Sequence, residues 1–260
     1  MSHHLVAVKD LRFAYPDGTP ALDGVTFTLH HGEAVGLVGG NGAGKSTLLL
    51  HLAGVLAPRS GEVRVGDWPV TPGTLREVRR SVGLVFQDPD DQLFMPTVED
   101  DVAFGPRQLG LDEREVEARV EDALARVGAA HLRRRAPHRL SGGEKRTAAI
   151  AAVLAMAPSV LVLDEPSSNL DPAARRALIG QLRAFEHTKI VASHDLDLVL
   201  EVCQRTIVLV GGRVAADGST VEVLSDDALL ARARLERPLR LQACPRCAEP
   251  ASTAIGRRPS

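Results

Sequence analysis

The residues best suited to chemistry are Gly39 to Thr47, which read GGNGAGKST. Their spacing fits G-x-x-x-x-G-K-[ST], a loop whose backbone N–H groups surround a phosphate chain. The apolar run of residues 33–40 leads into the loop, and a helical pattern follows it, as this motif requires. A plain glycine turn needs neither the lysine nor the hydroxyl groups, so the sequence predicts a phosphate-binding loop.

Each residue type in this loop has a distinct use. Glycine lets the backbone turn its N–H groups toward one anion without a side-chain clash. Lys45 is placed to reach the β- and γ-phosphates, and Ser46 is placed to hold Mg²⁺. The helix that begins near Lys45 adds the positive end of its dipole. The predicted nucleotide-binding residues are Gly39, Asn41, Gly42, Gly44, Lys45, Ser46 and Thr47.

A pair of carboxylates follows a second apolar run, SVLVLDEP, at residues 159–166. Asp164 is the expected Mg²⁺ partner that this class of nucleotide site needs. Glu165 comes next, where it could orient and deprotonate a water molecule that attacks the γ-phosphate. The simpler alternative is a pair of solvated acids that ends a strand. It does not account for their position at the edge where the phosphates must lie.

A second glycine-rich turn, LSGGEKR at residues 140–146, also opens a helix. Ser141 and Glu144 have the spacing of a capping box. Two adjacent glycines weaken a helix but expose N–H groups to an anion, which a capping box does not explain. In a two-fold pair, each turn could complete the phosphate site of the other subunit. The sequence permits this arrangement without requiring it.

Buried strands must position these groups. The runs 33–40, 159–166 and 189–195 are apolar, and each delivers polar residues at its carboxyl end. This pattern predicts an open α/β sheet with its ligand at the carboxyl edge. The segment RTIVLVGGRVAADGS predicts two further strands around a Gly211–Gly212 turn.

A mostly helical segment interrupts this sheet and carries the second glycine turn. Apolar residues recur in it at helical spacing among charged ones, namely Leu111, Val116, Val120, Leu124 and Val127. The expected division of the chain is a nucleotide-binding α/β core at 1–87 and 151–220, a helical subdomain at 88–150, a C-terminal helix at 221–240 and a disordered tail at 241–260.

Composition limits the classes of function. The 260 residues carry a formal net charge of -2 and only 3% aromatic residues, which argues against a nucleic-acid partner. No apolar run is long enough to span a bilayer, and the N-terminus lacks the layout of a signal peptide. Three cysteines, Cys203, Cys244 and Cys247, are too few for a disulfide framework, so we expect a cytosolic chain.

Taken together, these motifs resemble those of the ATP-binding subunit of an ABC transporter, over residues 5–220. The resemblance implies an α/β P-loop NTPase core with a mostly parallel sheet, an antiparallel β part and an inserted helical subdomain. It also implies hydrolysis of ATP with Mg²⁺, and a second ATPase subunit that is identical or related. LSGGE resembles the family signature, so Ser141, Gly142 and Gly143 are expected to contact the γ-phosphate held by the opposing subunit.

The family pattern assigns roles to four more residues. Tyr15 in FAYPDG falls where the family stacks an aromatic ring on adenine. Gln87 in VFQDP matches the glutamine that reports the nucleotide state, and we class it with both the catalytic and the Mg²⁺-binding groups. Asp171 in SSNLDP matches the loop that crosses the dimer interface. His194 in ASHD matches the histidine that touches the γ-phosphate and steadies Glu165.

Residues 86–106 narrow the resemblance to the energy-coupling-factor branch, which includes cobalt- and nickel-type members. In that branch the segment Gln87–Pro106 receives a transmembrane coupling subunit, and a substrate-binding membrane subunit is contacted only indirectly. The implied protein is a peripheral ATPase on the cytoplasmic face of the membrane that drives uptake of cobalt, nickel or a vitamin. An amphipathic helix that bears arginine would suit the apolar and acidic side chains of this segment, namely Leu93, Phe94, Met95, Asp88, Asp90 and Asp91.

Some features depart from the family pattern. Glu144 and Thr147 replace a common glutamine and arginine of the signature region, and Asn169 replaces a smaller residue. CPRC at residues 244–247 is only half of a zinc motif, and the acids near residue 90 have no histidine close by. We therefore assign no metal to either.

Three other functions stay open at this stage. A soluble ABC-type ATPase that acts on DNA or ribosomes usually has a long coiled coil, a second cassette or a basic linker, and the sequence shows none of these. A P-loop kinase would have no use for the signature turn. A regulatory module that binds nucleotide without turnover would differ only in lacking hydrolysis.

Overall fold

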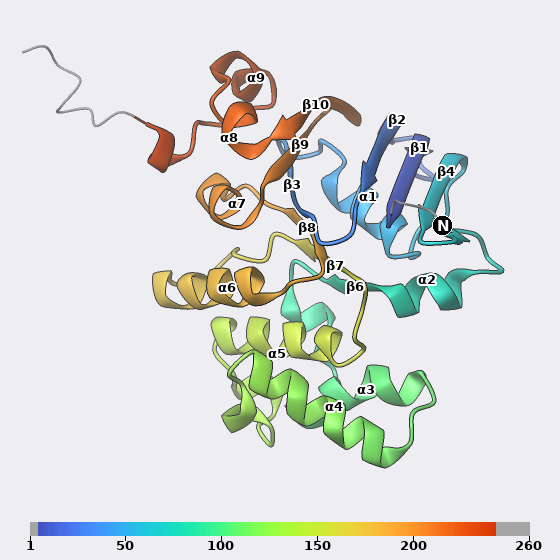
Figure 1. Ribbon diagram of the computed structural model, residues 1–260, viewed down its shortest axis with the longest axis vertical. Helices are drawn as coiled ribbons and strands as arrows, with labels where there is room; N and C mark the ends of the chain where they lie inside the picture. Colours follow the sequence, from blue (N-terminus) through green and yellow to red (C-terminus); the bar gives the residue numbers. More distant parts are fainter. Residues whose placement is uncertain (1–4, 243–260) are drawn as a thin grey trace, which may run out of the picture.

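The computed structural model describes residues 5–242, which form two β-sheets with helices around them (Figure 1). The larger sheet has the strand order β10-β9-β3-β8-β7-β6, and every neighbouring pair except β10 with β9 is parallel. The three runs that the sequence predicted as buried strands became β3, β8 and β7, which are adjacent. The strands are β3 (Ala34–Val38), β6 (Val82–Val85), β7 (Val160–Asp164), β8 (Thr188–Ala192), β9 (Arg205–Val210) and β10 (Arg213–Ser219).

A smaller antiparallel sheet lies at one side of the molecule (Figure 1). Its strand order is β2-β1-β4-β5. The strands are β1 (Val6–Ala14), β2 (Pro20–Leu29), β4 (Ser60–Val65) and β5 (Trp68–Pro69). The mostly parallel core and the antiparallel part that the family resemblance implied are therefore both present.

Strand β7 shows why the central strands have unbroken apolar runs. Val160 and Val162 pack in the core cluster shared with the antiparallel sheet, whereas Leu161 and Leu163 pack in the cluster on the opposite face. Side chains alternate between the two faces of a strand, so a strand covered on both sides has no solvated position for polar residues. Polar groups are confined to the strand ends, where the candidate site lies.

Helix α1 (Lys45–Leu52) packs between the two sheets. His51 is fully buried, its Nδ1 donates to the Thr47 carbonyl at 2.7 Å, and its ring meets Phe13 edge-on at 4.7 Å. Three leucines of the helix are buried in the same core cluster as strands of both sheets, namely Leu48, Leu49 and Leu52. The helix that begins at the phosphate loop is thus fixed by packing along its length.

The helical subdomain forms a lobe at the end of the molecule opposite helices α8 (Thr220–Val223) and α9 (Asp227–Arg232) (Figure 1). Asp112 and Glu115 form a capping box that starts α4 where the apolar spacing predicted a helix. Helix α5 passes the boundary expected at residue 150 and so joins the lobe to the core. The helices of the lobe are α3 (Val98–Gln108), α4 (Glu113–Arg126) and α5 (Gly142–Leu154), and those of the core include α2 (Leu75–Ser81), α6 (Pro172–Ala184) and α7 (Leu196–Val202).

The C-terminal segment is not the single helix expected over residues 221–240. It forms α8 (Thr220–Val223), α9 (Asp227–Arg232) and a 3₁₀ turn at Leu239–Leu241. Asp226 has an extended backbone and accepts a hydrogen bond from Leu229 N, so it interrupts the helix and caps the next one. The expected tail and its cysteines, from residue 243 onward, lie outside the described residues.

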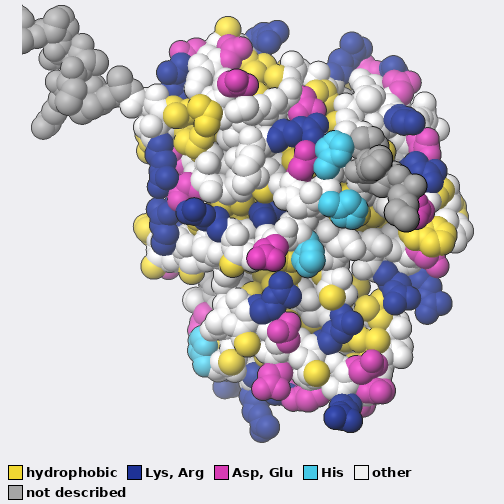
Figure 2. Space-filling model, in the orientation of Figure 1, with side chains coloured by type: hydrophobic (Ala, Val, Ile, Leu, Met, Phe, Trp, Pro, Cys, Tyr) yellow, Lys and Arg dark blue, Asp and Glu magenta, His cyan; other side chains and the backbone are white. Residues whose placement is uncertain are grey.

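The surface carries charges of both signs. On the face shown in Figure 2, basic and acidic side chains are interspersed rather than gathered into one field. None of the helices within residues 5–242 is both long enough and apolar enough to cross a bilayer.

His51 gives the stability of this fold a defined pH dependence. Burial lowers the pKa of His51 below its ordinary value of 6.5, because a charged ring would lie in an apolar core. The stability that this group contributes is present above the unfolded value and is lost as the pH falls through the lowered value. We expect the free energy of unfolding, measured with urea, to decrease between about pH 7 and pH 5.

The substitution His51→Leu should remove this part of the pH dependence, because leucine has no proton to gain. His31→Gln is the matched control, since His31 is exposed. A pH profile that His51→Leu leaves unchanged would contradict the assignment.

Candidate functional site

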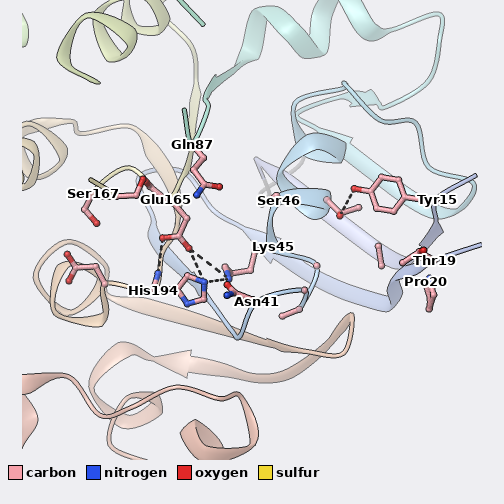
Figure 3. Close-up of a pocket in the computed structure, with 17 residues that line it drawn as sticks. Tyr15, Thr19, Pro20, Asn41, Lys45, Ser46, Gln87, Glu165, Ser167 and His194 are labelled. Carbon is pink, nitrogen blue, oxygen red and sulfur yellow. Dashed lines mark hydrogen bonds and ion pairs between the residues drawn. The ribbon is translucent and has the colours of Figure 1, made fainter. Parts of the chain in front are cut away.

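A polar pocket of about 620 Å³ opens at the carboxyl edge of the larger sheet (Figure 3). It brings together the predicted phosphate loop with Glu165, His194 and Gln87, which come from distant parts of the sequence. Gly39 and Asp164 do not line the pocket, although they adjoin residues of this edge. The predicted residues that do line it are Tyr15, Asn41, Gly42, Gly44, Lys45, Ser46, Thr47, Gln87, Glu165 and His194.

The phosphate loop follows a backbone path that depends on glycine. Gly42 has φ 74° and Gly44 has φ 102°, both in the left-handed region. A Cβ on Gly44 would lie 2.5 Å from the Ala21 carbonyl oxygen, so a side chain there would displace β2. The space beside Gly42 is open, which leaves the backbone of the loop accessible to an anion.

Lys45 holds its ammonium group among the polar groups of this site (Figure 3). Its Nζ donates to the Gly39 carbonyl at 2.8 Å and to His194 Nε2 at 3.0 Å, and it lies 3.9 Å from Glu165 Oε1. Burial lowers the pKa of Lys45, while the carboxylates of Glu165 and Asp164 act to raise it. Phosphate oxygens are suitable partners for such a buried cation.

Glu165 has a strained backbone at the end of β7. Its φ is 43°, in the region that disfavours residues other than glycine, and its N–H donates to Ala192 O at 2.9 Å. Oε2 accepts from the His194 backbone N–H at 3.0 Å, and Oε1 lies 3.4 Å from His194 Nε2. The side chain is only 13% exposed. These contacts fix a carboxylate beside Lys45, where it could take a proton from a water molecule.

The donor set at this edge fits a Mg²⁺ ion. Asp164 Oδ1 is buried without a hydrogen-bond partner, and an orphaned carboxylate oxygen calls for a cation. Ser46 lines the pocket and supplies a neutral oxygen, and Mg²⁺ prefers oxygen ligands. Among the described residues, no group of three His, Cys, Asp or Glu side chains could hold a metal alone. A cation here would therefore need substrate phosphates to complete its coordination shell.

The far end of the pocket is formed by the antiparallel sheet (Figure 3). The Tyr15 hydroxyl shares a hydrogen bond with Thr47 Oγ1 at 2.9 Å, and the Tyr15 ring meets Phe13 edge-on at 5.2 Å. Tyr15 is 36% exposed, so part of the ring is accessible to a planar ligand. Thr47 thus supports the aromatic group, a contact that the motif alone did not reveal.

Gln87 lies between this pocket and a second one of about 440 Å³. The Gln87 backbone is held from α5, because Arg146 Nη2 donates to Gln87 O at 2.5 Å and Nη1 to Phe86 O at 2.6 Å. Arg146 is only 3% exposed. The motifs of the sequence did not reveal this residue. The available signal was an arginine in a helix of mostly buried side chains, which must find carbonyl or carboxylate partners.

The second glycine turn has the predicted capping box. Ser141 Oγ accepts from Glu144 N at 3.3 Å, and Ser141 N donates to Glu144 Oε2 at 2.8 Å. Arg135 Nη1 donates to Glu144 Oε1 at 2.9 Å, so the charge of this glutamate is balanced. Thr147 Oγ1 donates to the Gly143 carbonyl at 2.9 Å and so bonds within its own helix. Both departures from the family pattern are accommodated locally.

The two glycine turns of one chain do not share a pocket. Ser141, Gly142 and Gly143 are absent from the lining of the Lys45 pocket, and Gly142 lines the second pocket instead. A Cβ on Gly143 would lie 2.8 Å from Ala174 Cβ, so this turn packs closely on α6. The second turn is therefore held against α6 and lies outside the pocket of the phosphate loop of its own chain.

The loop between β7 and α6 ends at Asp171, which caps the start of α6. Asp171 Oδ1 accepts from Ala173 N at 2.9 Å and from Ala174 N at 2.8 Å, which caps α6. Asn169 has φ 61°, and asparagine enters the left-handed region more readily than most residues. The left-handed backbone at position 169 therefore explains why asparagine stands there in place of the family's smaller residue.

The segment expected to receive a membrane partner is only partly exposed. Phe94 and Phe104 are 63% and 39% exposed, and their rings meet edge-on at 5.1 Å. The prediction was wrong for Leu93, which is 7% exposed and packs in the core because its N–H closes a turn with Pro89 O. Asp90 is also not a free charge, since Lys145 Nζ lies 2.6 Å from it.

Comparisons with known sequences agree on one family. A family model described as ABC transporter matches residues 22–168. The chain is 66% identical over 247 residues to a Geobacter sulfurreducens protein provisionally named an ABC transporter ATP-binding protein, covering 95% of this chain and 99% of that one. It is 46% identical over 239 residues to an energy-coupling factor transporter ATP-binding protein of Methanothermobacter thermautotrophicus, covering 90% and 77%.

Solved structures share the fold. One is cbiO1 from Clostridium perfringens, described as part of the ABC transporter complex cbiONQ, with a TM-score of 0.77, 38% identity and coverage of 88% of this chain and 94% of that one. Another is a dimeric ATP-binding cassette in a post-hydrolysis state with ADP and phosphate, with a TM-score of 0.74, 26% identity and coverage of 83% and 98%. These likenesses confirm the predicted fold class.

The geometry around Glu165 predicts how its amide analogue behaves. Glu165→Gln keeps the side-chain size but cannot take a proton, so ATP hydrolysis should fall by at least about 10²–10³-fold. Nucleotide binding should persist, because Lys45 and the phosphate loop are unchanged. Phosphate release measures the first quantity, and a fluorescent ATP analogue measures the second.

Glu236→Gln is the control for this pair of assays, since Glu236 is exposed. It should match the unmodified protein in both. Unchanged turnover in Glu165→Gln would remove Glu165 as the group that activates water.

Proposed function

The chain belongs to the ABC transporter family, whose ATPases couple ATP hydrolysis to transport, and we propose that it is the motor subunit of an energy-coupling-factor importer. The observation that carries this proposal is the separation of the two glycine turns. The Lys45 pocket lacks the Ser141 turn, which borders a different polar pocket. One chain therefore contributes half of each of two sites.

Substrate binding uses both ends of the Lys45 pocket. Tyr15 stacks on the adenine at one end, and the phosphate chain runs along the loop toward Lys45 at the other. The open backbone at Gly42 and the N-terminus of α1 bind the phosphates, and Lys45 neutralises the terminal ones. This orientation brings the γ-phosphate to Glu165 and His194.

Hydrolysis uses the groups at the ends of β7 and β8. Glu165 takes a proton from the attacking water, and His194 donates a hydrogen bond from its ring to the γ-phosphate while its backbone N–H holds the Glu165 carboxylate. Ser46, Asp164 and Gln87 would hold the Mg²⁺ ion, which neutralises charge on the phosphate oxygens when bound. Lys45 leaves its contact with His194 to meet the substrate.

The Ser141 turn acts on the nucleotide of a second ATPase chain, identical or related. In a two-fold pair, the N–H groups of Gly142 and Gly143 and the hydroxyl of Ser141 meet the γ-phosphate that the partner holds, since the Ser141 N–H is taken up by Glu144. Loss of that phosphate weakens the pair, so binding closes the two chains and hydrolysis opens them. The similar cassette described as dimeric with ADP and phosphate supports this arrangement.

Motion reaches the membrane through the lobe. The α/β core and the lobe of α3, α4 and α5 are the two moving bodies, and Arg146 fastens Gln87 to α5 of the lobe. Phe94 and Phe104 then form the apolar centre of the surface that receives a coupling helix of a transmembrane subunit. The chain would thus lie on the cytoplasmic face of the membrane.

Cobalt, nickel and vitamins are the candidate cargoes, because membrane subunits outside this chain select the solute. The alternative function is a soluble ABC-type ATPase without a transport partner. Purification of the complex from its native membrane distinguishes the two. A transmembrane chain that copurifies in fixed proportion supports the importer, and a complex without any transmembrane chain contradicts it.

The docking surface makes a separate prediction. Phe94→Asp and Phe104→Asp should each reduce affinity for the transmembrane subunit by about 30-fold, which corresponds to about 2 kcal/mol for an apolar anchor of an interface. ATP hydrolysis by the isolated chain should stay within about twofold, since neither ring lines the Lys45 pocket. Titration of the chain onto vesicles that contain the purified transmembrane subunit measures the affinity.

Trp68→Asp serves as the control, because Trp68 is an exposed aromatic residue of the antiparallel sheet. It should leave binding to those vesicles unchanged. Equal losses for Trp68→Asp and Phe94→Asp would mean that the Phe94 surface has no special part in docking.

A further inference from the structure

A bidentate ion pair joins the start of α6 to the residue that follows His194. Arg175, in the first turns of α6, donates from Nε and Nη2 to the two carboxylate oxygens of Asp195, at 2.5 and 2.8 Å. Both side chains are about three-quarters buried, with 25% and 23% exposure. A two-point pair between a planar guanidinium and a carboxylate fixes orientation as well as distance.

The Arg175 end of this pair is anchored to the loop that follows Glu165. The Arg175 N–H donates to Asp171 O at 2.9 Å, directly behind the cap of α6. Ser168 Oγ donates to Glu165 O at 2.8 Å, so the same loop is held at its other end. The Arg175 side chain therefore extends from the start of the helix that directly follows the Glu165 loop.

The Asp195 end is anchored to the His194 loop. Asp195 Oδ1 accepts from Leu198 N at 3.0 Å and caps α7, and the Asp195 N–H donates to Ser193 Oγ at 3.0 Å. Burial acts to raise the pKa of Asp195, but hydrogen bonds from Arg175 and Leu198 outweigh it and hold the pKa below its ordinary value. Asp195 is therefore held as a carboxylate between the two loops.

We propose that the Arg175–Asp195 pair positions His194 against Glu165 for hydrolysis. His194 is one residue from Asp195, and its backbone N–H holds Glu165 Oε2 at 3.0 Å. Because the pair ties the loop on each side of that hydrogen bond, it keeps His194 from moving away from Glu165 once Lys45 engages substrate. Neither Arg175 nor Asp195 carries out chemistry; they act through His194. This inference rests on the proposed roles of Glu165 and His194.

A positioning role differs from a merely stabilising one in steady-state kinetics. Loss of the pair should disturb the geometry needed in the transition state more than the binding of ATP at Lys45 and Tyr15. We expect Arg175→Ala to lower kcat by about tenfold or more, with KM for ATP within about twofold. Arg175→Lys should recover part of the rate, because lysine restores the charge but not the two-point contact.

The next residue supplies a matched control. Arg176 lies on the same helix and pairs with Glu201 at 2.8 Å, but its side chain is 59% exposed, and Glu201 does not line the pocket whereas Asp195 does. Arg176→Ala should leave kcat and KM within about twofold. Asp195→Asn keeps an acceptor that caps α7, so it tests the pair even if Arg175→Ala folds poorly. The double variant should lose no more activity than either single one, because the two side chains act as a unit.

The decisive experiment is steady-state ATP hydrolysis by the full chain and these variants, with thermal unfolding recorded on the same samples. A selective loss of kcat in Arg175→Ala and Asp195→Asn, with Arg176→Ala unaffected, supports the inference. An active parent protein whose Arg175→Ala and Asp195→Asn variants keep kcat within about twofold overturns it and leaves the proposed function intact. Absence of hydrolysis in the parent protein would instead overturn the proposed function.

Discussion

The structure depends on one buried cation at the carboxyl edge of a parallel sheet. Lys45 Nζ is only a few ångströms from the Gly39 carbonyl, His194 and Glu165, each of which ends a different strand or begins a loop. The strands are apolar on both faces, so polar groups can collect only at their ends. The same constraint that builds the core therefore gathers lysine, carboxylates and histidine into one pocket.

The helical lobe carries the second glycine turn, which does not line the Lys45 pocket. Its glycines pack on α6, and its capping box with Glu144 gives the helix a stable start without any ligand. Arg146, four residues into the same helix, holds the backbone of Gln87. A change in the Ser141 turn is thus linked through Arg146 to Gln87, which lines both pockets. This linkage suits a machine in which nucleotide joins two chains.

Local patterns predicted the parts of the site whose signals lie in a few adjacent residues. The glycine–lysine spacing, the apolar runs and the capping box of Ser141 all belong to this class. The misses needed contacts between distant segments: Arg146 with Gln87, Arg175 with Asp195, and Thr47 with Tyr15. Leu93 was misassigned because a single turn decides whether its side chain faces the core. The break at Asp226 was readable as a helix cap, and the single helix expected over residues 221–240 ignored that signal.

In the proposed mechanism, the Ser141 turn of another chain completes the ATP site at Lys45. Sedimentation velocity of the Glu165→Gln variant, alone and with any companion ATPase chain of its complex, tests this most directly. Mg-ATP should convert single chains into pairs, and Ser141→Arg should abolish that conversion while nucleotide binding is kept. Chains that stay single at saturating Mg-ATP, both alone and with a companion chain, would contradict a shared ATP site.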